Sequence, residues 1–421
     1  MESIGRRAFL QRAALLAAAL PLVGAAAACG RRGATPAGTS TAAALGQPLP
    51  VDAGLVLASD LPIERGATLR VYEWKEYLSA DVLRAFERAH EADDITVEVE
   101  SFTHIDEAVA RLQDPASDFD VVFPVIDVLP GLVDAGLLRP LNHDYLPHTR
   151  NLWSWFRGGD GPFYDPGQRY TTPYTVYTGG IGWRSDLLAG ADAPDRRGDP
   201  FDVFIDGRYR DRVGIYDAYR DALALGLQRA GVTDLRAAND TELGAAADFL
   251  AESVDVTNAR FTDDGAAEGL PEGVFAVHQA WSGDILTAPR YAAAEGGDPR
   301  EVAATLRYWS PSGPERVVGL DLTAICARGR HPVAAHAFLD HLLRFDVALD
   351  NFAWNGYQVP MDGATAEAFA DPGFPWHGAV PAQLRSAIVS EEAFAAGQML
   401  VGFGPSQDAR WLAQWSRVEP A

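Results

Sequence analysis

The chain is poor in lysine, in cysteine and in positive charge. Among its 421 residues, 35 are Lys or Arg and 58 are Asp or Glu, so the formal net charge is −23 at pH 7. Lys75 is the only lysine. A protein this acidic, without a basic patch, repels phosphate backbones, so we expect no nucleic-acid partner. The 2 cysteines are too few for a disulfide scaffold or a cysteine-rich zinc fold.

Signatures of enzymes and metal sites are also missing. The sequence has neither a G-x-S-x-G nucleophile elbow nor an H-E-x-x-H motif. His336, Asp340 and His341 could meet on one helix, but their apolar neighbours favour a packed helix over a metal site. We therefore expect no enzyme, cofactor or metal. A secreted hydrolase using paired carboxylates and a ferric-ion binder using tyrosines are the alternatives.

Residues 1–29 predict an export signal. An Arg-Arg pair precedes the apolar run from Ala13 to Val23, which is too short to span a bilayer permanently. The pair favours a twin-arginine signal over an ordinary secretory one. Cys29 follows three alanines and resembles the lipidated cysteine of bacterial lipoproteins. Residues 30–65, rich in Ala, Gly, Thr and Pro, predict a flexible tether. We expect a lipid-anchored protein in the periplasm or on the outer face of the cytoplasmic membrane.

Strand and helix patterns alternate from about residue 66. Leu69–Trp74 and Ile95–Glu100 alternate apolar and polar residues and predict strands, while Asp81–Ala89 predicts a helix that Ser79 caps. Such alternation implies a parallel sheet covered on both faces. The extended segment Thr172–Trp183 precedes a second series of the same kind.

This order predicts an α/β fold with two lobes and a cleft between them. The expected first lobe comprises residues 66–174 and 283–345. The second comprises residues 175–282 and 346–421, including the C-terminal helices. Open α/β sheets bind ligands at the carboxyl ends of their strands, so we expect the cleft to be the binding site.

Three segments at predicted strand ends combine an aromatic ring with a carboxylate: 73–77, 216–220 and 280–284. Carboxylates between aromatic walls suit a ligand with ammonium ends and a methylene body. A cation over a ring gains about 0.5–2 kcal/mol, a charge-assisted hydrogen bond about 1.5–3 kcal/mol, and each buried methylene about 0.8 kcal/mol. A linear polyamine uses all three. In the alternative interpretation the rings belong to the core and the acids cap helices.

The segments resemble motifs of the periplasmic spermidine/putrescine-binding proteins, the solute-capturing subunits of polyamine ABC importers. The resemblance covers most of the chain from about residue 66, and its motifs include Tyr-Glu-Trp-Lys-Glu-Tyr at 72–77, Phe-Asp-Val-Val-Phe-Pro at 119–124, Trp-Ser-Gly-Asp at 281–284, Gly-Leu-Asp at 319–321 and Gly-Tyr-Gln-Val-Pro at 356–360. It implies a two-lobed periplasmic-binding-protein fold of type II. It also implies a monomer that binds a small cationic solute and docks on a membrane permease.

The resemblance further implies roles for single residues. Trp74 and Tyr77 would stack on the polyamine, and Asp217 would bind an ammonium group. Trp281 and Asp284 of the Trp-Ser-Gly-Asp motif would do the same. The expected ligand-binding set is completed by Asp321 of the Gly-Leu-Asp motif and by the amide of Gln358.

Three of the departures from the family pattern place a charged residue. Lys75 replaces a small polar residue and would repel a cation unless it pairs with Glu76 or with an acid across the cleft. Asp127 stands where the family has an aromatic contact, and Arg220 stands where it often has a glutamate. A ligand that carries both a cation and an anion, such as an amino acid or a betaine-like solute, could use Lys75 and Arg220 together and is the alternative ligand.

Overall fold

The computed structural model describes residues 49–157, 163–263, 265–294, 296, 298–401 and 403–418. The predicted export signal, the lipidation residue Cys29 and the first part of the predicted tether lie outside these residues. None of the described helices is both long enough and apolar enough to cross a membrane.

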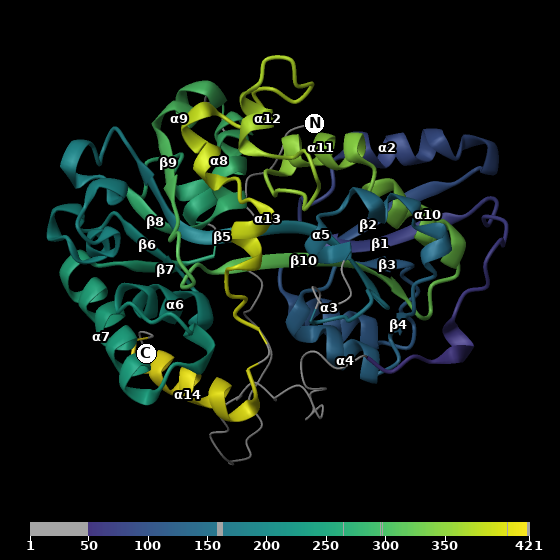
Figure 1. Cartoon of the computed structure of the whole chain (residues 1–421), viewed down its shortest axis with the longest axis horizontal. Coiled ribbons are helices and arrows are strands. Elements are labelled where there is room, and N and C mark those ends of the chain that lie inside the picture. Colours follow the sequence, from purple (N-terminus) through teal and green to yellow (C-terminus); the bar gives the residue numbers. More distant parts are fainter. Residues whose placement is uncertain are drawn as a thin grey trace, which may run out of the picture. The chain divides into compact units, whose positions relative to one another are not determined.

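The strands form one mixed sheet with two halves (Figure 1). The first half has the order β2-β1-β3-β10, the second has the order β8-β6-β7, and β5 lies between β10 and β8. β4 joins at β10, and β9 joins at β5. The strand bounds are Thr68–Trp74 (β1), Thr96–Phe102 (β2), Val121–Val122 (β3), Leu138–Arg139 (β4), Thr171–Arg184 (β5), Val213–Tyr216 (β6), Arg260–Thr262 (β7), Val277–Trp281 (β8), Leu306–Trp309 (β9) and Val318–Cys326 (β10).

The expected parallel pairing occurs only inside each half. β1 is parallel to β2 and β3, and β6 is parallel to β7 and β8. β10 is antiparallel to β3 and β5, and β5 is antiparallel to β8 and β9. The sheet is therefore mixed, because the strands that connect its halves run against their neighbours.

β5 belongs to both halves of the sheet. Its residues 171–178 pair with β10, and its residues 179–184 pair with β8 and β9. A strand of 14 residues extends about 46 Å, which is long enough to serve both. The expected return to the first lobe at residue 283 stays a prediction, and the strands show where the chain rejoins the first half of the sheet. β9 pairs with the second part of β5, so the chain rejoins the first half only at β10.

The α-helices of the described chain connect and cover the strands (Figure 1). Their bounds are Ala80–Ala89 (α2), Ile105–Gln113 (α3), Leu129–Asp134 (α4), Ser154–Arg157 (α5), Tyr219–Arg229 (α6), Asp240–Thr257 (α7), Ser282–Ala294 (α8), Pro299–Thr305 (α9), Pro332–Leu342 (α10), Phe345–Asn355 (α11), Ala366–Ala370 (α12), Glu391–Ala395 (α13) and Pro405–Trp415 (α14). The hydroxyl of Ser79 accepts from the Val82 amide at 3.2 Å, which confirms Ser79 as the N-cap of α2.

Helices lie on both faces of the first half, as the alternation in β1 predicts. Val71 packs in one apolar cluster with Phe86 of α2 and with α10, whereas Tyr72 packs in another with Leu112 of α3. In the second half, α6, α7 and α14 share a third cluster with β6 and β8. Successive side chains of a strand point to opposite faces, so one strand supplies two cores.

Residues 49–65, which the sequence assigned to the flexible tether, pack onto the first half. Leu49 is buried there. The guanidinium of Arg139 donates to the Leu55 carbonyl at 2.8 Å, and the amide of Asn142 donates to the Leu57 carbonyl at 3.0 Å. The predicted tether therefore extends too far along the chain, because burial and satisfied backbone carbonyls fasten its last residues.

Helices α6 and α7 approach each other closely at Gly226. A Cβ atom added to Gly226 would lie 2.7 Å from the Ala246 Cα atom, inside van der Waals contact. On α7, a Cβ atom added to Gly244 would meet only the tip of the Arg417 side chain at 3.8 Å. The two glycines therefore offer a matched pair for testing this contact.

We predict that Gly226→Ala lowers the free energy of unfolding by about 1–3 kcal/mol, because the added methyl group overpacks the helix contact. The control Gly244→Ala should raise the free energy of unfolding by up to about 1 kcal/mol, because alanine favours a helix more than glycine does. Urea unfolding followed by circular dichroism measures both. Equal effects of the two substitutions would contradict the close approach of α6 and α7.

Candidate functional site

Asp321, in β10, is a buried carboxylate surrounded by hydroxyl groups. Its Oδ2 atom accepts hydrogen bonds from the Tyr77 hydroxyl and, at 3.4 Å, from the Thr175 hydroxyl. Tyr177 also donates to this carboxylate. Tyr77 lies in the loop after β1, and Thr175 and Tyr177 lie two residues apart on β5, so both point to the same side of the strand. The structure thus brings together two residues of the expected set, Tyr77 and Asp321.

Asp284, in the first turn of α8, is held in the same way from the second half of the sheet. Its Oδ2 atom accepts from the Tyr216 hydroxyl at the end of β6, and its Oδ1 atom accepts from the Tyr357 hydroxyl at 2.5 Å. The Tyr216 hydroxyl in turn accepts from the Trp281 backbone amide at 2.7 Å. The alternative role of Asp284 as a simple helix cap is therefore not what the structure shows, since both its oxygens accept from tyrosines.

Aromatic rings connect the two carboxylates. Tyr357, which follows α11, packs edge-on against Tyr77 and Tyr177, with ring centroids 5.5 and 5.6 Å apart. Trp281 packs edge-on against Tyr177 at 4.8 Å and stacks on Tyr216 at 5.9 Å. We call this group the aromatic–carboxylate cluster; it comprises Tyr77, Thr175, Tyr177, Tyr216, Trp281, Asp284, Asp321 and Tyr357.

The glycine of the Trp-Ser-Gly-Asp motif allows this packing. A Cβ atom added to Gly283 would lie 2.5 Å from the Tyr357 ring, too close for any side chain. The ring therefore lies directly against the backbone of α8, one residue before the carboxylate that its hydroxyl binds. This explains why the motif has a glycine between the indole and the acid.

Burial decides the protonation of the cluster. It raises the pKa of Asp321 to about 6, although the hydrogen bonds from Tyr77, Thr175 and Tyr177 oppose the shift. It also raises the pKa of Asp284. Burial and the nearby Asp321 carboxylate raise the pKa of Tyr77 well above its usual value, so the phenol remains a donor. Among the described residues, no Lys or Arg binds Asp284 or Asp321, so a cationic ligand would meet uncompensated charge.

A cavity of about 180 Å³ adjoins the cluster. Tyr177, Trp281, Asp221, Asp127 and Arg220 are among the residues that line it. We call it the cleft cavity, because Asp127 follows β3 of the first half and Asp221 lies in α6 of the second. Burial raises the pKa of Asp221 to about 7, although the adjacent Arg220 opposes the shift.

Asp221 is a lining residue that the sequence analysis missed. The expected acid was Asp217, but Asp217 is exposed and precedes α6, whose first residue is Tyr219. Asp221 lies one helical turn after Asp217 and directly before the buried run of α6 that starts at Ala222. The apolar run that begins at Ala222 was the sequence signal that could have indicated a partly buried acid at Asp221.

Trp74 and Lys75 stand apart from the cluster. The Trp74 ring packs on Phe102 with centroids 4.7 Å apart, and among the described residues no ring contact or hydrogen bond joins it to the cluster. Its indole Nε1 is buried and has no partner within the described part of the chain. Lys75 is exposed and does not pair with Glu76. Glu76 instead binds Arg290 and accepts from the Tyr291 hydroxyl.

The remaining expected residues have other partners. Asp127 is exposed at the cavity and forms an ion pair with Arg220. Gln358 is buried, and its amide binds the backbone of Val389 in both directions, at 2.9 Å each. The amide of Gln358, which we expected to bind the ligand, therefore stabilises the segment that follows the 3₁₀ turn Ala382–Ala387.

The three residues weighed as a metal site have separate partners. His336 binds the Pro332 carbonyl and the Asn142 amide, Asp340 binds His148, and His341 contacts the Val82 carbonyl. Within the described ranges, no group of three or more His, Cys, Asp or Glu is arranged to hold a metal ion.

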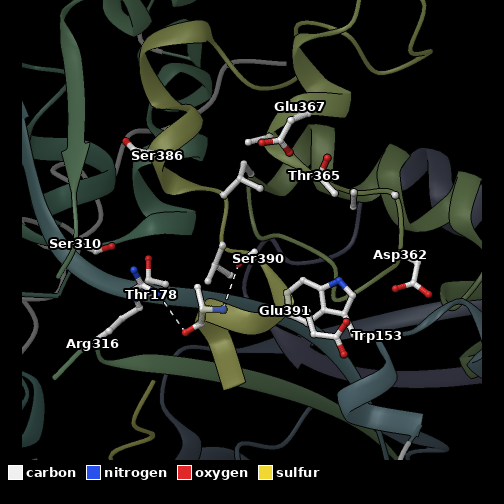
Figure 2. Close-up of a pocket in the computed structure, with 16 residues that line it drawn as sticks. Trp153, Thr178, Ser310, Arg316, Asp362, Thr365, Glu367, Ser386, Ser390 and Glu391 are labelled. Carbon is white, nitrogen blue, oxygen red and sulfur yellow. Dashed lines mark hydrogen bonds between the residues drawn. The ribbon is translucent and has the colours of Figure 1, made fainter. Parts of the chain in front are cut away.

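A larger cavity of about 400 Å³ lies beside α12 and α13 (Figure 2). Figure 2 shows Arg316 at one end of it and Asp362 with Trp153 at the other. Two of its three carboxylates have partners: Asp362 pairs with Arg157 at 3.0 Å, and Glu391 accepts from the Ser154 hydroxyl at 2.6 Å. No member of the aromatic–carboxylate cluster lines this cavity, so we place the candidate site at the cleft cavity.

Comparison of the sequence with known proteins identifies one family. The family model described as bacterial extracellular solute-binding protein matches residues 81–375. A putrescine/agmatine-binding protein of Pseudomonas aeruginosa is 25% identical over 307 residues, which are 71% of this chain and 80% of that protein. The putrescine-binding periplasmic protein PotF of Escherichia coli is 25% identical over 287 residues, 66% of this chain and 74% of that protein.

Solved structures show the same fold. The spermidine/putrescine ABC transporter substrate-binding protein PotD from Streptococcus pneumoniae superposes with a TM-score of 0.66 at 20% identity, over 83% of this chain and 98% of that one. The TpPotD lipoprotein of Treponema pallidum superposes with a TM-score of 0.65 at 18% identity, over 84% of this chain and 99% of that one. These likenesses confirm the expected two-lobed fold of periplasmic binding proteins.

Glu73, in the first motif, is a buried carboxylate with few partners. Its side chain accepts from the Leu78 amide, and its Oε2 atom has no hydrogen-bond partner among the described residues. Burial raises the pKa of Glu73 to about 8. The folded state therefore binds this proton more tightly than the unfolded state, whose pKa is about 4.3. The stability that Glu73 contributes is present at low pH and is lost as the pH rises toward 8.

We predict that Glu73→Gln removes this loss of stability. Near pH 9 the variant should exceed the parent protein in free energy of unfolding by roughly 1–3 kcal/mol more than it does near pH 5. Urea unfolding at the two pH values measures the difference, and Glu98→Gln, at an exposed position, is the control that should show no such trend. A pH-independent difference between Glu73→Gln and the parent would refute the raised pKa.

Proposed function

Because the chain belongs to the family of bacterial extracellular solute-binding proteins, we propose that it captures a linear polyamine of the putrescine and spermidine type. It would then deliver the polyamine to the permease of an ABC importer. One observation carries the proposal: the half-buried carboxylate of Asp284 and the buried carboxylate of Asp321 are linked by aromatic rings at the junction of the two half-sheets. The ligands in the names of the relatives support the same class.

The carboxylates retain capacity for a ligand. A carboxylate offers about four acceptor positions, and each oxygen of Asp284 has one tyrosine donor. An ammonium group can therefore add a charge-assisted hydrogen bond without displacing the tyrosines. The faces of Tyr177 and Trp281, which line the cleft cavity, suit the methylene chain and the cation–π contact.

The two lobes would close on the ligand. Tyr77 and Asp321 come from the first half of the sheet, whereas Trp281, Asp284 and Asp221 come from the second. A ligand that binds both groups favours the closed arrangement, as in hinge closure around a solute. We propose that an open form takes the solute first and that the closed monomer then docks on the permease.

A second ligand class has one observation in its favour. Arg220 lines the cleft cavity beside Asp221, so a zwitterionic amine or amino acid could place a carboxylate on Arg220 and an ammonium group on Asp221. Arg220 already binds the carboxylates of Asp127 and Asp408. A ligand carboxylate would have to compete with both, and for this reason we favour the polyamine.

The polyamine proposal predicts a specific loss in Asp284→Ala. A hundredfold excess of ligand over Kd stabilises a protein by about 2.7 kcal/mol, and loss of a charge-assisted hydrogen bond weakens binding by roughly ten- to a hundredfold. We expect thermal shifts with putrescine or spermidine to fall accordingly, measured at about pH 8, which is above the raised pKa of Asp321 and that of Asp221. Asp255→Ala, which removes an exposed acid on α7, should keep the full shift. An unchanged shift in Asp284→Ala would mean that the site is misplaced.

We also propose that a lipid on Cys29 anchors the protein outside the cytoplasmic membrane. In cells that express the full chain, Cys29→Ser should move the protein from the membrane fraction to the soluble exported fraction, since the anchor residue is gone. Cys326→Ala, which removes the buried free cysteine, should leave it in the membrane fraction. Immunoblots of the two fractions measure this, and membrane retention of Cys29→Ser would contradict the anchor.

A further inference from the structure

Arg220 occupies a fixed position at the cleft cavity. Its guanidinium pairs with Asp127 across the cleft and with Asp408 of α14 at 3.0 Å. It also donates to the Leu400 carbonyl at 3.3 Å and lies over the Phe403 ring, 4.8 Å from the centroid. Contacts on several sides leave the group little freedom to move when a ligand enters.

The cavity between Arg220 and the cluster is short. Its volume of about 180 Å³ corresponds to about six water molecules at 30 Å³ each. A four-carbon diamine has about six non-hydrogen atoms, so it needs roughly this space. Asp127 is the exposed polar residue of the lining, whereas Arg220, Asp221, Tyr177 and Trp281 are half-buried. Asp127 therefore marks the rim of the cavity, and the guanidinium of Arg220 is bound to it.

We infer that Arg220 limits the length and charge of the ligand, so that the site accepts a short diamine and rejects a polyamine with a third ammonium group. This inference rests on the proposed function. Inside the cavity one ammonium group can bind Asp221. A second can lie against the rings of Tyr177 and Trp281, which separate the cavity from the carboxylates of Asp321 and Asp284. A longer chain would extend to the rim, where its next ammonium group meets the fixed positive charge of Arg220. The third ammonium group would then be repelled by the guanidinium, or it would have to displace Arg220 from its ion pair with Asp127.

Removal of the guanidinium should reverse this selection. In Arg220→Gln the rim keeps the carboxylates of Asp127 and Asp408 but loses the cation between them. The rim then becomes negative and suits a third ammonium group. Arg220→Lys keeps the positive charge and should keep the selection. Arg229→Ala removes an arginine from the same helix, where it pairs with Asp202 away from the cavity, and serves as the matched control.

Calorimetric titration of the full chain with putrescine, spermidine and a four-carbon ω-amino acid tests the inference. The parent protein, Arg220→Lys and Arg229→Ala should bind putrescine at least about tenfold more tightly than spermidine. Arg220→Gln should reduce that ratio to about threefold or less, through a gain in spermidine affinity. Because a gain of binding requires a folded protein, misfolding of Arg220→Gln cannot imitate this result.

The other outcomes separate the two hypotheses. Equal binding of putrescine and spermidine by the parent protein would overturn the role of Arg220 and leave the proposed function standing. A proportional loss of both ligands in Arg220→Gln would also overturn that role. Tightest binding of the ω-amino acid would show that Arg220 holds a ligand carboxylate, which overturns the inference. Binding of neither amine by the parent protein would overturn the proposed function together with the inference.

Discussion

The site depends on carboxylates that are held without a protein cation. Asp321 is buried and Asp284 is half-buried, and tyrosine hydroxyls supply the hydrogen bonds that hold both carboxylates. Hydroxyls satisfy an acceptor without neutralising its charge. A salt bridge to a Lys or Arg of the protein would also have supplied hydrogen bonds, but it would have neutralised the charge that a cationic ligand can bind. The hydrogen bonds therefore stabilise the cluster in the folded protein, and its carboxylates still lack a positively charged partner.

The long central strand turns this local arrangement into a site shared by two lobes. β5 pairs with β10 through its first residues and with β8 through its last. Each carboxylate is thereby attached to a different half of the sheet while their tyrosine partners remain in ring contact. A second contact crosses the cleft where Asp127 meets Arg220. Two departures from the family pattern, Asp127 and Arg220, thus line the cavity, whereas the third, Lys75, stands apart from it.

Several features of the fold and site were predictable because their causes are local. The alternation in β1 and the Ser79 cap of α2 depend on neighbouring residues only. The pairing of β9 with β5 was not predictable, because its partner is a strand more than a hundred residues earlier in the chain. The sequence analysis named Asp217 and not Asp221, because the sequence does not show that α6 begins only at Tyr219. The amide of Gln358 was assigned to the ligand, because its pairing with Val389 leaves no sequence pattern.

The sequence by itself determined the class of molecule: an acidic α/β chain with aromatic rings next to acids at its strand ends. Composition, periodicity and short motifs carry that information, since each involves residues close together in the chain. Only the tertiary structure decided which rings and acids meet. Tyr357 reaches Asp284 because Gly283 lets its ring lie against α8. Arg220 is fixed by groups from distant segments, and contacts of that kind arise only when the chain folds.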